Sequence, residues 1–322
     1  MRGKRWIWLL CAALLAASVL LAVFLRPGRQ RAEAASVPAS AGAVRTAAAT
    51  TAPPAAVSTS APTSAPTPLQ AQQQALAQTA AVQDTLAQAL DALVEPYGKK
   101  AAVSYRRLSD NALYLYNPDT KFHIASLVKA PYCMWLLDRA AEGDVDLQET
   151  LTLRAANKRT GAGTFQYAPD GTTYSVSEVI AQTIRKSDNT AFAMLRARYG
   201  TAGYIAYTEN FALAHPEDVR QVTDGRITAR DADRYLLALE RFFRENPNGG
   251  VLETHLRASE FRLIRNVESV QKWGDYSGCY SVMGLVCADE PYLLSVLTRD
   301  FANIEETARL VGRITDAIEK NS

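Results

Sequence analysis

The chain has 322 residues, of which 48% are hydrophobic and 21% are charged, so it can bury the core of one large domain or two modest ones. Its 35 basic and 33 acidic residues leave a net charge of only +2. With no basic stripe interleaved with aromatic residues in its globular part, the composition argues against binding to nucleic acid.

The first 31 residues are predicted to be a membrane anchor or a signal sequence. Basic residues precede an uncharged run of 20 residues, from Trp6 to Leu25. As a helix this run would span roughly 30 Å, the thickness of the hydrocarbon core of a bilayer. Basic residues follow it directly, which favours an uncleaved signal anchor over a signal peptide cleaved near residues 32–34. We therefore expect a single-pass protein of the cell membrane with its domain outside the cytoplasm, or a secreted protein if cleavage occurs.

Residues 32–68 consist almost entirely of Ala, Thr, Pro, Ser and Val. A segment of this composition cannot bury enough apolar surface to offset its conformational entropy, and its prolines keep it extended. The sequence therefore predicts a disordered linker at 32–68 and a globular domain at 69–322.

The globular part carries the pattern of one α+β domain. Its apolar periodicities and turn residues predict the following elements. In chain order they are a helix ending at Val94, strands at 101–108 and 112–116, a mostly helical stretch at 126–245, strands at 267–274, 280–287 and 292–298, and a closing helix at 304–318. This order predicts a five-stranded antiparallel sheet with flanking helices and an inserted all-helical subdomain.

The strongest local signal is Ser126 followed by Lys129, at the start of an apolar run at 130–137. Ser126 would open a buried helix, on which residues three apart share a face, so the Lys129 amine would lie beside the serine hydroxyl. A serine nucleophile needs a base at neutral pH, and burial lowers the pKa of a lysine enough to make it one. Alone, however, this spacing also occurs in ordinary helices.

Two further patterns follow along the chain. Residues 187–189 read Ser-Asp-Asn between two segments of helical pattern, where alone they would pass as a helix-capping loop. Residues 272–274 read Lys-Trp-Gly near the end of a predicted strand, where the glycine would let a ligand approach the backbone.

The three patterns, in this order and on these elements, resemble the layout of class A β-lactamases and penicillin-binding proteins. The resemblance covers about residues 70–322 and is especially close to the exported serine hydrolases related to β-lactamases. It implies the β-lactamase/transpeptidase-like fold, with Ser126 attacking a carbonyl and Lys129 taking its proton. Ser187 would relay a proton to the leaving nitrogen, and Lys272 would orient Ser187 and attract a substrate carboxylate.

The resemblance also implies a set of substrate-binding groups. Asn189 would hydrogen-bond the amide side chain of the substrate. The backbone N–H groups of Ser126 and of Asp275, the residue after Gly274, would form the oxyanion hole, in which the loss of one donor typically costs about 10²–10³ in rate.

Two positions depart from the family pattern. Class A β-lactamases carry a glutamate in a Glu-x-x-Leu-Asn setting that activates the deacylating water, and the nearest candidate here, Glu217, lacks the Leu-Asn that should follow. The residue between Lys272 and Gly274 is usually Thr or Ser, but here it is Trp273, which either presents a flat surface to a different ligand or simply packs. Both departures weaken the case for efficient β-lactam hydrolysis.

Metal sites, disulfides and cofactors are not expected. The three histidines lie far apart without metal-ligand spacing. Cys133 is expected to be a buried thiol, and Cys279 and Cys287 bracket a predicted strand about 25 Å long, too far apart to pair with each other.

The sequence leaves three functions open. The leading one is a β-lactamase-like active-site serine hydrolase, acylated at Ser126, that hydrolyses β-lactams. The second is a D-alanyl peptidase or amidase acting on peptidoglycan peptides. The third is a tethered, non-catalytic binding module of the same fold. In each case we expect a monomer.

Overall fold

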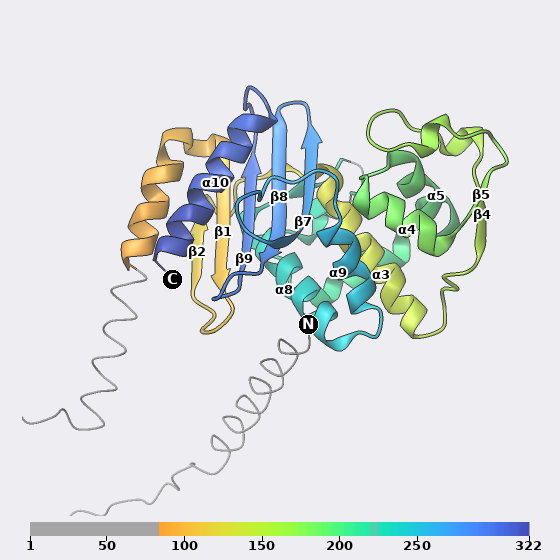
Figure 1. Ribbon diagram of the computed structural model, residues 1–322, viewed down its shortest axis with the longest axis horizontal. Coiled ribbons are helices and arrows are strands. Elements are labelled where there is room, and N and C mark those ends of the chain that lie inside the picture. The colour runs from red at the N-terminus through yellow and green to blue at the C-terminus, as the bar shows by residue number, and fades with distance from the viewer. Residues whose placement is uncertain (1–83, 220, 223, 322) are drawn as a thin grey trace, which may run out of the picture. The chain divides into compact units, whose positions relative to one another are not determined.

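The computed structural model describes residues 84–219, 221–222 and 224–321 (Figure 1). The predicted anchor or signal sequence at 1–31 and the predicted linker at 32–68 lie outside these residues, so both stay predictions. Within the described part, no helix is both long enough and apolar enough to span a membrane.

A five-stranded antiparallel sheet forms the centre of the domain, in the order β2-β1-β9-β8-β7. The N-terminal strand pair β2-β1 joins the three C-terminal strands β9-β8-β7 through β1, which aligns with β9 along its whole length. The bounds are β1 Ala101–Arg107, β2 Leu113–Tyr116, β7 Ser269–Tyr276, β8 Cys279–Val286 and β9 Tyr292–Thr298. The five predicted strands and the predicted fold class are confirmed, with shifts of one or two residues at the strand ends.

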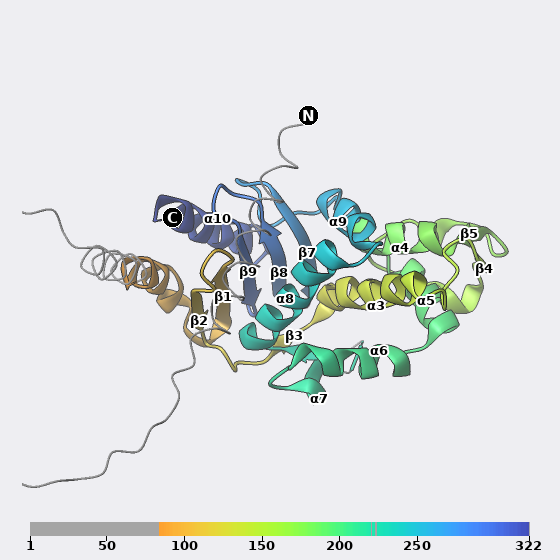
Figure 2. The same cartoon turned by 90° about the horizontal axis from the view of Figure 1, so that it is seen from below.

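Helices cover both faces of this sheet (Figure 2). The helical residues 84–94 and α10 (Ile304–Lys320) pack on one face, and α8 (Ala229–Glu245) packs on the other. Two hydrophobic clusters result, one on each face, and the side chains of β9 are buried throughout because they contribute to both. The predicted helices at the two ends of the domain are thus confirmed.

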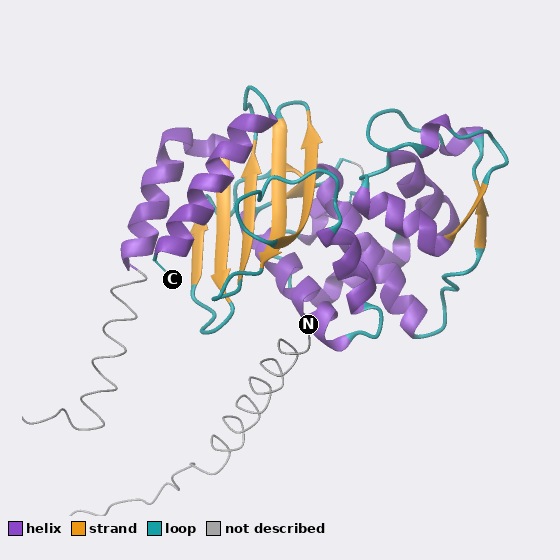
Figure 3. Ribbon diagram, in the orientation of Figure 1, coloured by secondary structure: helices purple, strands orange, loops and turns teal. Residues whose placement is uncertain are grey.

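The chain between β2 and β7 folds mainly into helices, several of which lie beyond the edge of the sheet at β7 (Figure 3). Besides α8, these are α3 Lys129–Ala141, α4 Val176–Arg185, α5 Asn189–Tyr199, α6 Ala202–Tyr207, α7 Pro216–Val219 and α9 Gly249–Arg257. Two short strand pairs accompany them, β3 (Phe122–His123) with β6 (Arg226–Ile227) and β4 (Thr150–Thr152) with β5 (Thr173–Ser175). Strands of two or three residues are too short for their alternation to be recognised in a sequence.

Polar side chains fix where several of these helices begin. Ser175 and Glu178 form a reciprocal capping box at the start of α4, and Thr228 and Asn303 cap α8 and α10. Asp188 caps α5 by accepting the N–H groups of Thr190 and Ala191 at 2.9 Å each. These caps satisfy N–H groups that have no partner within the helix, so each sets a helix start at one residue.

Candidate active site

The predicted nucleophile, Ser126, lies at the junction between the sheet and the helices. It belongs to a single 3₁₀ turn, η2 (Ala125–Val128), and α3 begins only at Lys129. The serine therefore precedes the α-helix that it was expected to open, although turn and helix run on without a break. Ser126 is half-buried, whereas Leu127 and Val128 beside it are buried in the core.

Lys129 points into the interface between α3 and the start of α5. Its side chain is 3% exposed, and Nζ donates to the Ser187 carbonyl at 2.5 Å, to Asn189 Oδ1 at 2.8 Å and to Ser187 Oγ at 3.3 Å. Burial lowers the pKa of the Lys129 ammonium from 10.5 to about 7, against a smaller opposing effect of the Asp188 carboxylate. Near neutral pH a large fraction of this lysine is thus a free amine that can accept a proton.

Ser187 is placed between two lysines by the short connection from α4 to α5. Its backbone is in the left-handed region, with φ +52°, and its side chain is buried. Lys272 Nζ donates to Ser187 Oγ at 3.0 Å, and Lys129 Nζ lies 3.3 Å from the same oxygen. One hydroxyl thus connects the two amines, which is the arrangement a proton relay requires.

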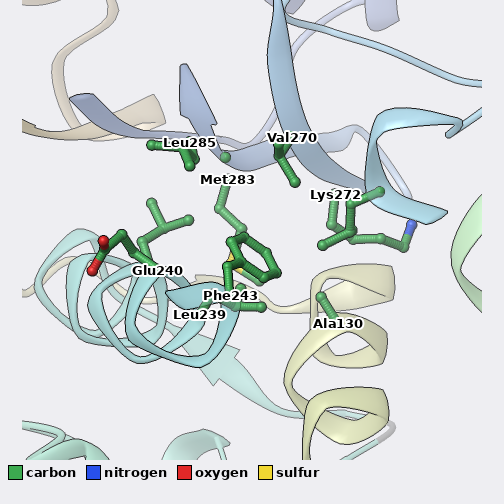
Figure 4. Close-up of a pocket in the computed structure, with 11 residues that line it drawn as sticks. Ala130, Leu239, Glu240, Phe243, Val270, Lys272, Met283 and Leu285 are labelled. Atoms are coloured by element: carbon green, nitrogen blue, oxygen red, sulfur yellow. The ribbon is translucent and has the colours of Figure 1, made fainter. Parts of the chain in front are cut away.

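Lys272 extends from β7 and is 1% exposed, with Nζ also donating to the carbonyl of Trp273 at 2.8 Å. Burial first, and then repulsion by Lys129, lower the pKa of Lys272 well below its ordinary value. Figure 4 shows the stem of Lys272 beside a small apolar cavity, with its nitrogen directed away from Met283 and Phe243. The stem is therefore surrounded by hydrocarbon, and the amine reaches oxygen partners only at its tip.

Gly274 brings the backbone of β7 against the nucleophile. A Cβ atom built on Gly274 would lie 2.8 Å from the backbone nitrogen of Ser126 and 3.1 Å from that of Leu127. Such contacts are too short for a side chain, so only glycine allows strand and turn to come this close. Asp275 follows on the same edge strand and is exposed. Of the predicted site residues, the structure thus brings together Ser126, Lys129, Ser187, Asn189, Lys272 and Gly274.

A family model described as "Beta-lactamase enzyme family" matches residues 85–321. The chain belongs to the β-lactamase enzyme family.

Several solved structures share the fold of this chain. The chain is 23% identical to PBP-A, a point mutant of which was solved as an acyl-enzyme complex with penicillin G, with a TM-score of 0.64 over 73% of this chain and 96% of that one. It is 20% identical to a β-lactamase from Sphaerobacter thermophilus DSM 20745, with a TM-score of 0.63 over 73% and 95% of the two chains. An ancestral class A β-lactamase matches at 17% identity and a TM-score of 0.62, over 74% and 100%. Among curated proteins, none matches the chain by sequence.

Asp188, to which the sequence pointed only as a helix cap, organises the helical wall of the β-lactamase-family site. Besides capping α5 with Oδ1, it accepts the N–H groups of Thr164 and Phe165 with Oδ2, at 2.7 and 2.8 Å. The loop passes so close that a Cβ atom on Gly163 would lie 2.1 Å from Asp188 Cγ. The buried carboxylate therefore fixes both the start of α5 and the neighbouring loop. The only sequence signal for this was the Gly-Ala-Gly at 161–163, which requires a partner distant in sequence.

Asn189 is held on two sides. Its Oδ1 accepts from Lys129, and its Nδ2 donates to the carbonyl of Thr160 at 3.0 Å. Its amide is thus oriented by the protein alone, in contact with the predicted base. Binding of a substrate amide by Asn189 stays a prediction.

Trp273, one of the predicted substrate-binding residues, packs in the core. Its side chain is 6% exposed and belongs to the hydrophobic cluster on the face of the sheet that carries α10, and its ring lies 5.0 Å from that of Phe261. Successive side chains of a strand point to opposite faces, so Lys272 and Trp273 cannot both face Ser126. Of the two alternatives drawn from the sequence, the structure favours packing over ligand contact.

Glu217, the candidate deacylation base, lies on the one-turn helix α7. Its side chain is 67% exposed, with Oε1 4.0 Å from His215 Nδ1. Within the described residues, no hydrogen bond or ion pair joins Glu217 to Ser126, Lys129 or Asn189. The geometry gives Glu217 no contact that would make it a base, so that role stays a prediction.

The loop that carries Glu217 is anchored by a buried aspartate that sequence reasoning missed. Asp231 Oδ1 accepts the N–H of Ala214 at 2.6 Å, and Asp231 Oδ2 accepts the hydroxyl of Thr228 at 2.9 Å. Asp231 is fully buried in the first turn of α8, so this loop is attached at its base.

We predict that Gly274→Ala lowers the rate of Ser126 acylation by a nitrophenyl ester at least about 10²-fold, the typical effect of losing one oxyanion donor. The added methyl would push β7 away from the Ser126 N–H. The matched control is Gly312→Ala in α10, where a Cβ atom meets nothing within 4 Å. That variant should acylate normally and gain roughly 0.5–1 kcal/mol in unfolding free energy. A wild-type rate in Gly274→Ala would show that this close approach does not contribute to the reaction.

Proposed function

We propose that the protein is an acyl-serine hydrolase that reacts with β-lactams and forms a covalent ester at Ser126. The observation that carries this proposal is the buried Lys129–Ser187–Lys272 chain, in which one hydroxyl lies 3.3 Å from one amine and 3.0 Å from the other. A binding module has no physical need for a desolvated lysine whose pKa is lowered to about 7. The matched base therefore favours catalysis over simple binding.

In the proposed reaction, Ser126 Oγ attacks the lactam carbonyl carbon while the Lys129 amine takes the hydroxyl proton. The oxygen that becomes negative accepts hydrogen bonds from the N–H groups of Ser126 and Asp275. The carbon–nitrogen bond then breaks, and Ser187 Oγ gives its proton to the leaving nitrogen. Ser187 is reprotonated through its contacts with the two lysines, which completes acylation.

β-Lactams are the proposed acyl donors because a point mutant of PBP-A, a protein of the same fold, forms an acyl-enzyme with penicillin G. Hydrolysis of that ester requires an activated water. The exposed position of Glu217 leaves this step without an evident base, so we expect the acyl-enzyme to be long-lived. A slow water reaction favours a natural donor other than an antibiotic, and we propose the D-alanyl peptide of peptidoglycan as that donor.

Intact-mass analysis with benzylpenicillin tests this function. Residues 70–322 should gain the mass of one penicillin, and Ser126→Ala should gain none. The adduct should last far longer than the time in which an efficient β-lactamase completes one catalytic cycle. An adduct that decays rapidly would establish β-lactam hydrolysis and require a deacylating base that we have not identified. The absence of an adduct on the wild-type chain would refute the β-lactam proposal.

The pH dependence of acylation tests the role of Lys129. Because burial lowers the pKa of Lys129 to about 7, its free amine exists above that pH and is lost below it. The acylation rate should therefore rise with pH, with a midpoint near 7. Lys129→Arg keeps a cation but cannot deprotonate, so it should lose about 10²–10⁴ in rate at every pH. A rate that is flat between about pH 5 and pH 9 would exclude Lys129 as the base.

We further propose that residues 1–31 tether this domain to the outer side of the cell membrane, as the charge-free run from Trp6 to Leu25 predicts. Fractionation of cells expressing the full chain should place it with the membranes, accessible to added protease. The chain lacking residues 1–31 should remain inside the cell. Recovery of the full chain from the medium would favour the cleaved signal peptide instead.

A further inference from the structure

The mechanism leaves one buried ionisable group next to the nucleophile without a role. His123 ends β3, three residues before Ser126, and its side chain is 8% exposed. Its Nδ1 accepts a hydrogen bond from the N–H of Ala125 at 2.9 Å. The imidazole therefore contacts the peptide backbone that leads directly into Ser126.

Ala125 needs such a partner because its backbone is strained. Its φ is +46°, in the left-handed region that is unfavourable for a residue with a Cβ atom. Without a fixed hydrogen bond, the chain could relax to an ordinary conformation, and the N–H of Ser126 would turn away from its position against Gly274. The bond from His123 opposes that rotation.

The face of the same imidazole rests on the other wall of the oxyanion hole. The rings of His123 and Tyr276 are stacked, with centroids 4.0 Å apart and planes 12° from parallel. Tyr276 ends β7 and directly follows Asp275, the second predicted oxyanion donor. His123 thus hydrogen-bonds Ala125, which precedes the first oxyanion donor, and stacks on Tyr276, which follows the second donor.

We propose that His123 is a positioning residue that clamps the two halves of the oxyanion hole, η2 and the end of β7, at the separation that acyl transfer requires. This inference rests on the proposed acyl transfer at Ser126. His123 itself touches neither the nucleophile hydroxyl nor the leaving group in this arrangement. Its removal should consequently slow the acylation step and leave substrate binding almost unchanged.

The clamp works only when His123 is neutral, because Nδ1 must carry a lone pair to accept the Ala125 N–H. Burial lowers the pKa of His123, and Arg226 on the paired strand β6 lowers it further, whereas Asp224 acts in the opposite direction. The other two groups that face His123 come from the sheet: the Tyr276 ring, which stacks on it, and the Cys279 thiol, which hydrogen-bonds the His123 backbone. Protonation would set an N–H against an N–H and release the strained turn.

Two substitutions test the hydrogen bond to Ala125 and the stacking on Tyr276 separately. His123→Asn keeps an acceptor, because an asparagine side chain readily bonds the N–H two residues onward. His123→Phe keeps an aromatic ring over Tyr276 but has no acceptor. We expect His123→Phe to lower the maximal acylation rate by benzylpenicillin at least about tenfold, with its half-saturating concentration within about threefold of wild type. His123→Asn should retain more than about a third of the wild-type rate at neutral pH. His255→Phe, which removes a half-buried histidine elsewhere, should match wild type.

The pH profile distinguishes a positioning role of His123 from a merely structural one. Both wild type and His123→Asn should lose activity as Lys129 is protonated, so the ratio of their rates cancels that effect. Below the lowered pKa of His123 the ratio of wild type to His123→Asn should fall, because only the histidine stops accepting. A constant ratio, or a His123→Phe variant that folds and acylates at the wild-type rate, would overturn the proposal.

Amide hydrogen exchange separates this inference from the proposed function, because it needs no substrate. The Ala125 amide should exchange at least about tenfold faster in His123→Phe than in wild type or His123→Asn, with melting temperatures that show all three to be folded. If benzylpenicillin leaves the wild type unmodified, the β-lactam proposal fails while this measurement still decides the clamp. Equal exchange of the Ala125 amide in all variants would refute it.

Discussion

The site depends on two lysine side chains that are buried away from water and share one hydroxyl, that of Ser187. Within the described residues, the hydrogen-bond partners of Lys129 and Lys272 are carbonyl, amide and hydroxyl oxygens, and none is a carboxylate. A buried ammonium without a counter-ion is costly, and releasing its proton relieves that cost. The lowered pKa values of both amines are thus a consequence of where the chain places them, and no special property of the lysines is needed.

Three distant segments must meet to create this environment. The start of α3 brings Lys129, the α4–α5 connection brings Ser187, and the edge strand β7 brings Lys272. Two carboxylates, those of Asp188 and Asp275, act electrostatically on Lys129, and Asp275 also acts on Lys272. Asp188 uses its two oxygens to accept four backbone N–H groups, so it holds the helical wall without pairing directly with the amines. Left-handed backbone at Ala125 and at Ser187 places strain on both sides of the site, as is common where geometry matters more than local stability.

Much of this architecture could be predicted from the sequence because its signals are local. The five strands alternate or run apolar, the terminal helices have clear periodicity, and the Ser126, Ser187 and Lys272 motifs fall on the elements that place them together. Helix α9 lies beyond the helical stretch predicted at 126–245. Its first residues, Gly249 and Gly250, are poor helix formers, and Leu252 and Leu256 are buried in the core cluster that the neighbouring helices share. Tertiary burial of this kind has no local signature.

The parts of the site that could not be predicted depend on contacts between distant residues. The two roles of Asp188 require the loop at 161–165 to pass beside α5, and nothing in the residues 187–189 reveals that neighbour. The contact of His123 with Tyr276 joins positions more than a hundred residues apart in sequence. The packing of Trp273, in contrast, could have been predicted, because the two-residue period of a strand implies that its side chain leaves the opposite face from that of Lys272.

The opposite directions of Lys272 and Trp273 mean that a single strand serves as reaction wall and as structural core. Trp273 packs with the layer that α10 and residues 84–94 form on the back of the sheet, and one peptide bond joins it to Lys272. Selection for faster acylation would therefore act on the layer formed by α10 and residues 84–94 as well as on the residues around Ser126. Laboratory evolution of this protein for faster acylation should therefore also accumulate substitutions in that layer, which lies across the sheet from Lys272.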